Sequence, residues 1–188
     1  SVAVLDVGSS KITALTGERG VNGTFVINGM AEVPYDGFSE GQFFNASAFK
    51  NAVNSAVKSL NYSLLKSANK IFVGVPAAFI RLENKKYRLS LGKKRRIKRR
   101  DIEDLFNAGK DKVVASGYEI VYSSDVYFTL DDNRRVIDPI GNVSSVLGGF
   151  VCYQLCETYF TSLVRSALAE FKLGFVEFIY EGYTEGRY

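Results

Sequence analysis

The segment Val2–Lys11 reads VAVLDVGSSK and joins an apolar run to a turn of small polar residues. The run predicts a strand that delivers Asp6 near its end. Backbone N–H groups around a glycine can approach phosphate oxygens because no Cβ intervenes, and hydroxyls add further donors. A carboxylate beside such a turn suits a hydrated magnesium ion that also binds phosphate. The stretch therefore predicts phosphate contacts from Gly8, Ser9, Ser10 and Lys11, with magnesium at Asp6. The other interpretation is a polar hairpin turn.

Composition limits the chemistry available to the chain. Its 188 residues are 46% hydrophobic, which fits one large domain or two small ones. The sequence contains no histidine, which excludes Ser-His-Asp and Cys-His catalysis. No apolar run approaches the roughly 20 residues that span a bilayer, and no signal peptide precedes Leu5, so we expect a cytoplasmic protein. Cys152 and Cys156 lie about 13 Å apart along a predicted strand, too far for a disulfide.

The positive charge of the chain, formally +4, comes from one segment, residues 93–100, in which seven of eight residues are basic. Outside this segment 17 basic residues face 20 acidic ones, so the basicity is a local patch. Such a patch can attract nucleic acid, anionic lipid or an acidic protein. A nucleic-acid reader usually interleaves aromatic residues, whereas only Ile97 interrupts this run. The other interpretation is a solvated, mobile loop. The possible anionic-partner patch, called the basic segment below, comprises Lys93, Lys94, Arg95, Arg96, Lys98, Arg99 and Arg100.

The order of predicted elements indicates an insertion within a parent α/β domain. Asn45 can cap a helix with one apolar stripe, and Gly174 can stop the final helix. The expected strands are residues 2–7, 11–18, 23–33, 71–75, 79–82, 87–91, 119–130, 134–137, 146–156 and 176–180. The expected helices begin after Asn45 and cover residues 101–116 and 158–172.

A meander that opens with residues 6–11 and leads to a helix resembles the first phosphate loop of the actin and Hsp70 superfamily. The segments 96–102, 119–130 and 138–141, with the strand to Cys156, resemble the inserted subdomain of the bacterial cell-division family FtsA. The resemblance implies an α/β (α+β) fold, an actin-like ATPase of RNase H-like architecture. Subdomain 1A would comprise residues 1–69 and 157–188. Residues 70–156 would form the inserted strand-helix-strand-strand subdomain, 1C.

The same resemblance implies a function in cell division. FtsA-like proteins bind ATP and magnesium, polymerise on the inner face of the cytoplasmic membrane at the septum, tether FtsZ and recruit other division proteins. Asp6 would serve magnesium, and Gly8, Ser9, Ser10 and Lys11 the phosphates. Subdomains 1A and 1C would supply contacts for self-association and partners. The family implies no catalytic residue here and at most a weak ATPase, with membrane contact only through segments outside this chain and no nucleic acid.

Departures from the family leave alternatives open. Lys98 stands where the family places a helix-capping Thr, so this helix would lose one side-chain cap worth about 1 kcal/mol unless Asp101 takes over that role. The chain ends before a second phosphate loop, so we expect ATP binding by this fragment to be weak or absent and the fragment to be inactive. A PilM-like platform of a pilus or secretion system shares the insertion but lacks the membrane helix. A nucleic-acid-binding module that uses the basic segment is a third hypothesis.

Overall fold

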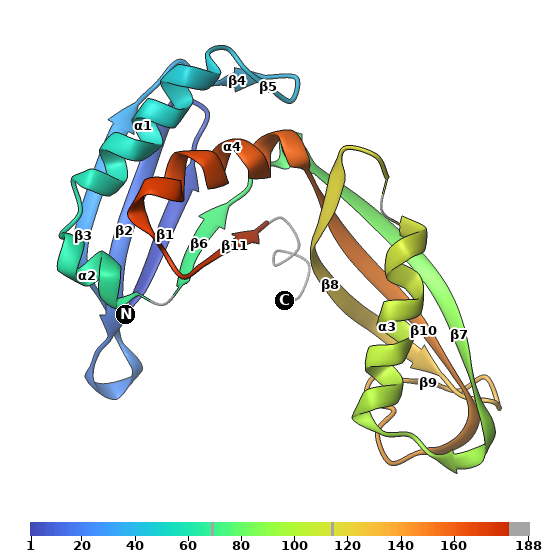
Figure 1. The fold of residues 1–188 in the computed structure, drawn as a ribbon. Coiled ribbons are helices and arrows are strands. Elements are labelled where there is room, and N and C mark those ends of the chain that lie inside the picture. Colours follow the sequence, from blue (N-terminus) through green and yellow to red (C-terminus); the bar gives the residue numbers. More distant parts are fainter. Residues whose placement is uncertain (69, 114, 181–188) are drawn as a thin grey trace. The chain divides into compact units, whose positions relative to one another are not determined.

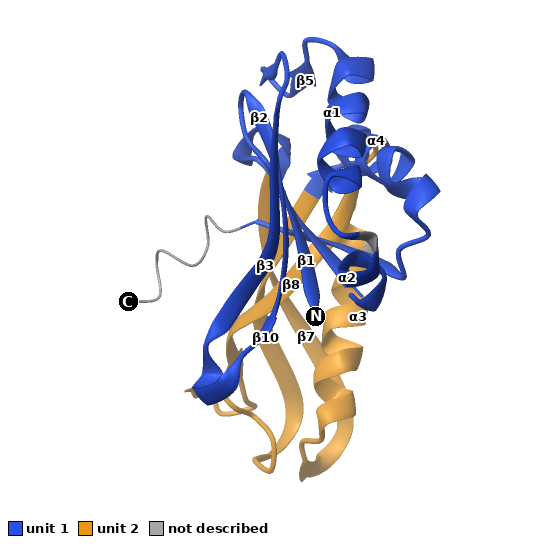
Figure 2. Cartoon of the chain, turned by 90° about the vertical axis from the view of Figure 1, so that its left-hand side faces the viewer, with its two compact units in different colours: residues 1–80, 156–188 blue, residues 81–155 orange. Residues whose placement is uncertain are grey.

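The computed structural model describes residues 1–68, 70–113 and 115–180, and the chain divides into two compact units. The first unit comprises residues 1–80 and 156–188, and the second comprises residues 81–155 (Figure 2). The second unit is thus inserted between two segments of the first. Residues 181–188, which the sequence places in the first unit, lie outside the described residues.

A five-stranded mixed sheet forms the centre of the first unit, in the order β11-β6-β1-β2-β3 (Figure 1). Strand β1 pairs antiparallel with β2 and parallel with β6, which in turn pairs parallel with β11. The predicted opening meander is confirmed, with a register shift between Thr16 and Gly17 where β2 meets β3. The strands are β1 (Val2–Val7), β2 (Lys11–Arg19), β3 (Phe25–Pro34), β6 (Lys70–Gly74) and β11 (Phe175–Ile179).

The helices α1 (Ala46–Lys58), α2 (Tyr62–Ser67) and α4 (Thr158–Leu168) lie on one face of this sheet (Figure 1). Asn45 caps α1, since its Oδ1 accepts a hydrogen bond from the Ala48 N–H at 2.9 Å. The predicted apolar stripe of α1 is buried. Within the described ranges, no helix combines the length and apolar character needed to cross a bilayer.

Aromatic rings fill the space between these helices and the loop that precedes them. A short hairpin, β4 (Phe38–Ser39) and β5 (Gln42–Phe43), carries Phe43 to the helix layer. The Phe43 ring stacks on Phe49 of α1 with centroids 4.0 Å apart. Phe79 and Phe160 of α4 lie 4.8 Å apart in the same cluster. Packing of large rings therefore ties the segment before the insertion to the helix that follows it.

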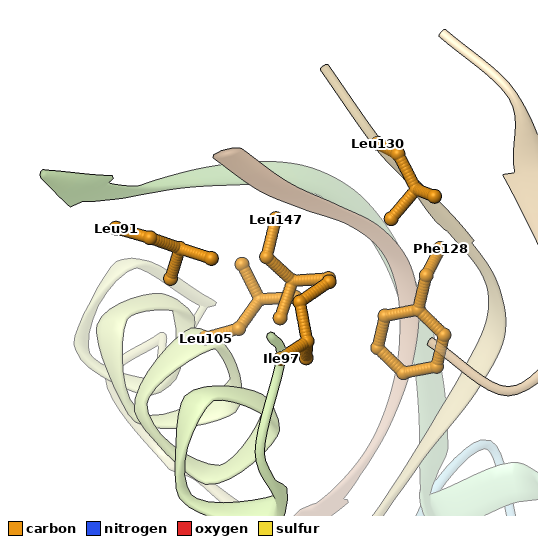
Figure 3. Packing of buried hydrophobic residues seen from close by; sticks show 6 residues of the cluster. All are labelled: Leu91, Ile97, Leu105, Phe128, Leu130 and Leu147. Atoms are coloured by element: carbon orange, nitrogen blue, oxygen red, sulfur yellow. The ribbon is translucent and has the colours of Figure 1, made fainter. Parts of the chain in front are cut away.

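The second unit packs one helix against a four-stranded sheet in the order β7-β10-β8-β9. Its elements are β7 (Ile80–Arg96), α3 (Arg99–Val113), β8 (Tyr118–Thr129), β9 (Arg135–Val136) and β10 (Val143–Glu157). The predicted strand-helix-strand-strand order is present, and the additional short strand expected at residues 134–137 is the two-residue β9. Side chains from the sheet and α3 form its core, namely Leu91, Ile97, Leu105, Phe128, Leu130 and Leu147 (Figure 3).

Two boundaries differ from those read off the sequence. The insertion was expected to start at Lys70, but β6 pairs with β1 and β11, so residues 70–80 belong to the first unit. The strands expected at 79–82 and 87–91 form the single strand β7, which pairing with β10 carries through the polar residues between them.

Two further sequence predictions concern the end of α4 and the environment of the cysteines. Helix α4 ends at Leu168, before the expected end at residue 172, and a 3-10 turn over Ala169–Phe171 follows. The left-handed Lys172, at φ 49°, ends this turn ahead of the expected stop at Gly174. Cys152 and Cys156 both lie in a strand, β10, as the sequence predicts, and both are buried.

Gly109 on the inner face of α3 provides a test of packing in the second unit. A Cβ at this position would collide with the ring of Tyr87 and the hydroxyl of Tyr153. The Tyr87 hydroxyl also donates to the Gly109 carbonyl at 3.1 Å. Helix propensity alone favours Gly109→Ala by about 1 kcal/mol. We expect overpacking to outweigh this gain and lower the free energy of unfolding by about 1–2 kcal/mol, measured by urea denaturation. Asn107→Ala, at an exposed position on α3, is the control and should not destabilise. A stabilised Gly109→Ala protein would contradict the packing.

Candidate functional site

The turn between β1 and β2 is closed by its own backbone. The Gly8 N–H donates to the Lys11 carbonyl at 2.9 Å, and a Cβ on Gly8 would lie only 2.9 Å from that oxygen. Glycine is therefore required here for the tightness of the turn. Because the Gly8 N–H is used within the turn, it is not available for the phosphate contact expected from the sequence, whereas Ser9 and Ser10 are both exposed.

A second segment holds this turn in place. The Tyr35 hydroxyl donates to the Gly8 carbonyl at 2.7 Å, and the Tyr35 N–H donates to the Ser10 carbonyl at 2.9 Å. Burial raises the pKa of Tyr35 to about 12, so its hydroxyl remains a donor at neutral pH. Gly37, at φ 85°, passes so close to the Ser9 carbonyl that a Cβ would collide with it. The turn is thus held in place by the segment that follows β3.

Asp6 lies on the face of the sheet opposite to the helices. It follows buried Leu5 in β1, so strand alternation turns its carboxylate outward. Its neighbours across the sheet are Thr13 of β2 and Gly74 of β6. A Cβ on Gly74 would lie 3.0 Å from Asp6 Oδ1, so this glycine leaves the space that the carboxylate occupies.

A hollow of about 420 Å³ opens beside this carboxylate. It is formed by Val4, Asp6, Val7, Leu15, Gly74, Val75, Pro76, Ile179 and Tyr180. Nowhere in the described ranges do three or more His, Cys, Asp or Glu side chains form a metal cluster. A single carboxylate beside an open hollow nevertheless fits magnesium, which keeps much of its water and takes further oxygens from phosphate.

Lys11 is already paired in this structure. Its Nζ lies 2.6 Å from Glu32 Oε1 on β3, and Thr13 Oγ1 donates to the same oxygen at 3.4 Å. The hydrogen bond from Lys11 lowers the pKa of Glu32. Asp6, Thr13 and Glu32 occupy adjacent strands at matching register, so they form one polar row across the open face.

Sequence reasoning found Asp6 and the turn but missed their supports. Glu32 follows from the hairpin register, and Gly74 is a glycine inside an apolar strand, which often marks a close approach of another group. Tyr35 and Gly37 gave no comparable signal. Their contacts depend on how the loop after β3 returns to the turn.

The basic segment is divided by the fold. Residues 93–96 end β7, and Arg99 and Arg100 begin α3, so the mobile-loop interpretation is wrong. Arg95 forms two hydrogen bonds with Asp101, at 2.7 and 2.9 Å. Asp101 Oδ2 also accepts from the Lys98 N–H at 2.8 Å and so caps the start of α3, which is the alternative that the sequence left open. Arg95 is therefore structural. The other six cations, Lys93, Lys94, Arg96, Lys98, Arg99 and Arg100, are exposed.

Comparisons with known proteins agree with this architecture. Residues 78–152 match the family model described as "SHS2 domain inserted in FTSA". The chain is 23% identical to the cell division protein FtsA of Pseudomonas aeruginosa over 137 residues, which is 73% of this chain and 33% of that protein. A chain of the solved "PilM-PilN type IV pilus biogenesis complex" has a TM-score of 0.53 over 94% of this chain and 45% of its own length, at 10% identity.

Together the mixed sheet of the first unit and the inserted second unit define an actin-like fold that carries an SHS2 domain. The SHS2 domain is of the kind inserted in FtsA, and the resemblance to FtsA that the sequence predicted is confirmed. The chain spans about a third of the length of the FtsA that it matches.

The Arg95–Asp101 pair gives a prediction with a defined pH dependence. Hydrogen bonding from Arg95 is the largest cause that holds the pKa of Asp101 at about 2, below its ordinary 3.8. Since Asp101 is buried, at 6% exposure, this shift corresponds to roughly 2 kcal/mol of stability at neutral pH. A lowered pKa contributes fully above the ordinary value and loses its contribution as pH falls through the folded value.

Asp101→Asn should therefore lower the free energy of unfolding at neutral pH by roughly 2 kcal/mol. The difference from the unmodified chain should shrink as pH falls from about 4 towards about 2. Urea denaturation over a series of pH values measures both effects. Asp104→Asn, at an exposed position on the same helix, is the control. A difference that stays constant over the whole pH series would contradict the assignment.

Proposed function

We propose that this chain is part of an FtsA-like, actin-fold scaffold that binds ATP with magnesium, polymerises at the cytoplasmic membrane, tethers FtsZ and recruits further division proteins. The observation that carries the proposal is the juxtaposition of Asp6, the Gly8–Lys11 turn and an open hollow on one edge of an actin-like sheet. The matches to the SHS2 domain of FtsA and to FtsA itself support the cell-division role. We place the protein in the cytoplasm, peripheral to the membrane at the division site.

In this proposal each group at the edge has a distinct task. Ser9 and Ser10 donate hydrogen bonds to phosphate oxygens, and Lys11 neutralises phosphate charge after exchanging its Glu32 partner. Asp6 orients the water shell of magnesium, which when bound screens the phosphate charge. We assign no general base here, so the residues of this chain bind and orient nucleotide, and any ATPase activity is weak.

The second unit would act as the interaction module. Its sheet and helix form a core separate from that of the first unit. Its surface can therefore contact neighbouring subunits and division proteins without using Asp6 or the Gly8–Lys11 turn, which we call the nucleotide edge. The match of this unit to the inserted domain of FtsA supports that division of roles.

A PilM-like platform is the second candidate. The structural likeness to a chain of the PilM–PilN complex covers 94% of this chain, whereas the sequence match to FtsA covers 73%. The two candidates share the fold and differ in partner. We favour FtsA because the sequence comparisons point to it, whereas a likeness at 10% identity speaks for the fold alone.

Asp6→Ala tests the magnesium site in the full-length protein. We expect magnesium-dependent ATP affinity to fall about ten- to hundredfold, because the water shell of the ion loses its oriented carboxylate. Thermal stability should stay unchanged, since Asp6 is exposed at a strand end. Nucleotide titration with and without magnesium measures the first effect and circular dichroism the second. Glu18→Ala removes an exposed carboxylate of β2 away from the turn and is the control. Unchanged affinity in Asp6→Ala would remove the role given to this residue.

Co-sedimentation with FtsZ filaments distinguishes the two candidates. The FtsA-like proposal predicts that the full-length protein sediments with FtsZ filaments and stays in the supernatant without them. Absence of FtsZ binding, together with binding to a PilN-type pilus protein, would instead support the PilM-like platform.

A further inference from the structure

One end of the second unit gathers exposed cations beside exposed aliphatic side chains. The β7–α3 connection and the loop that precedes β10 meet there, as Figure 1 shows. The Ile97 N–H donates to the Asn142 carbonyl at 2.9 Å, and the Gly141 N–H donates to the Ile97 carbonyl at 3.0 Å. Buried Ile97 thus fixes residues 138–142 next to the basic segment. We call residues 93–100 together with residues 137–143 the basic end.

Four aspartates in or beside the basic end form salt bridges or accept hydrogen bonds. Asp101 binds Arg95, and Asp132 pairs with Arg134 at 2.6 Å. Asp131 accepts from the Ser145 N–H, and Asp138 accepts from the Ile140 N–H. Asp131 and Asp138 keep their negative charge, since a backbone donor does not neutralise it, but the six exposed cations of the basic segment outnumber these two carboxylates. Within the described residues, two of the six lie close enough to a carboxylate to lower its pKa: Lys94 acts on Asp131, and Lys98 acts on Asp101.

Three aliphatic side chains of the basic end are exposed to solvent beside these cations. Ile137 is 83% exposed, Ile140 42% and Val143 47%. Residues 91–100 and 131–143 contain no aromatic residue, so the basic end offers no platform on which bases could stack. Cations that flank exposed aliphatic groups are the combination that suits a lipid interface, where phosphates meet acyl chains.

We propose that the basic end binds the surface of an anionic lipid bilayer. The exposed lysines and arginines contact lipid phosphates, while Ile137, Ile140 and Val143 enter the interfacial region. This contact is separate from the nucleotide edge and from any membrane segment outside this chain, so it departs from the expectation that only such segments reach the membrane. It does not depend on the proposed function, because it uses other residues and needs no nucleotide.

Vesicle sedimentation of the 188-residue chain tests this proposal. The chain should sediment with vesicles of phosphatidylcholine and phosphatidylglycerol, and not with phosphatidylcholine alone. High salt should weaken the binding. Arg96→Glu combined with Arg100→Glu should weaken it at least about tenfold. Ile137→Ser, which leaves the charge unchanged, should weaken it as well, and simple attraction between opposite charges does not predict this loss.

The matched control reverses the same number of charges in the same unit. Lys110→Glu combined with Lys112→Glu alters two exposed cations near the end of α3 and should retain vesicle binding. Arg100→Glu places a negative charge at the helix start, where the helix dipole favours it, whereas the control pair opposes the dipole. A loss confined to the Arg96 and Arg100 variant therefore does not come from a weakened helix.

Several outcomes would overturn the proposal. Equal binding to neutral vesicles, no binding to anionic vesicles, or equal losses in the variant and the control would each do so. Binding to polyglutamate without binding to vesicles would identify an acidic protein as the partner instead. Salt-sensitive binding to duplex DNA without binding to vesicles would indicate nucleic acid. None of these results depends on ATP, so the nucleotide proposal stands or falls separately.

Discussion

The pairing of β1 at the centre of the first sheet is the constraint on which the candidate site depends. Because side chains alternate along a strand, the position that buries Leu5 beneath the helices turns Asp6 to the open face. The antiparallel partner β2 returns the chain directly, so the turn lies beside that carboxylate. The parallel partner β6 brings Gly74, whose missing side chain leaves room for it. A register slip by one residue would bury Asp6 and expose Leu5, so the core and the site specify the same register.

In the second unit the Arg95–Asp101 pair has a comparable role. It joins the end of β7 to the first turn of α3 across the connection that holds Ile97 in the core. One cation of the basic segment is thereby used in the fold. The Asp101 carboxylate also accepts from the backbone N–H of Lys98, so the helix start has a side-chain cap although Lys98 itself has no acceptor. Local charge density in the sequence overstated the number of free cations. The fold turns a uniform basic run into one structural arginine and six exposed side chains.

Much of this fold follows from local pattern. The apolar run at residues 2–7 predicts β1, and the helical stripe after Asn45 predicts α1. The spacing of apolar residues in the second unit likewise predicts its order of elements. The insertion boundary did not follow, because the apolar run of β6 has the same pattern whichever sheet it joins, and only parallel pairing with β1 decides. The candidate site divides in the same way. Asp6 and the turn are contiguous in sequence. Glu32 and Gly74 lie near them only because of the strand register, and Tyr35 only because the loop after β3 folds back onto the turn.

The Lys11–Glu32 pair decides how a phosphate could bind at the turn between β1 and β2. Both side chains are about half exposed, and such surface pairs contribute little, about 0–1 kcal/mol. A phosphate carries more charge than one carboxylate and accepts several hydrogen bonds, so it can displace Glu32 from Lys11 at small cost. Thr13 also donates to Glu32, so the released carboxylate keeps a partner on its own row. The pairing seen here therefore keeps Lys11 near the turn without removing it from the site, which is the behaviour required of a residue that neutralises a ligand held by its neighbours.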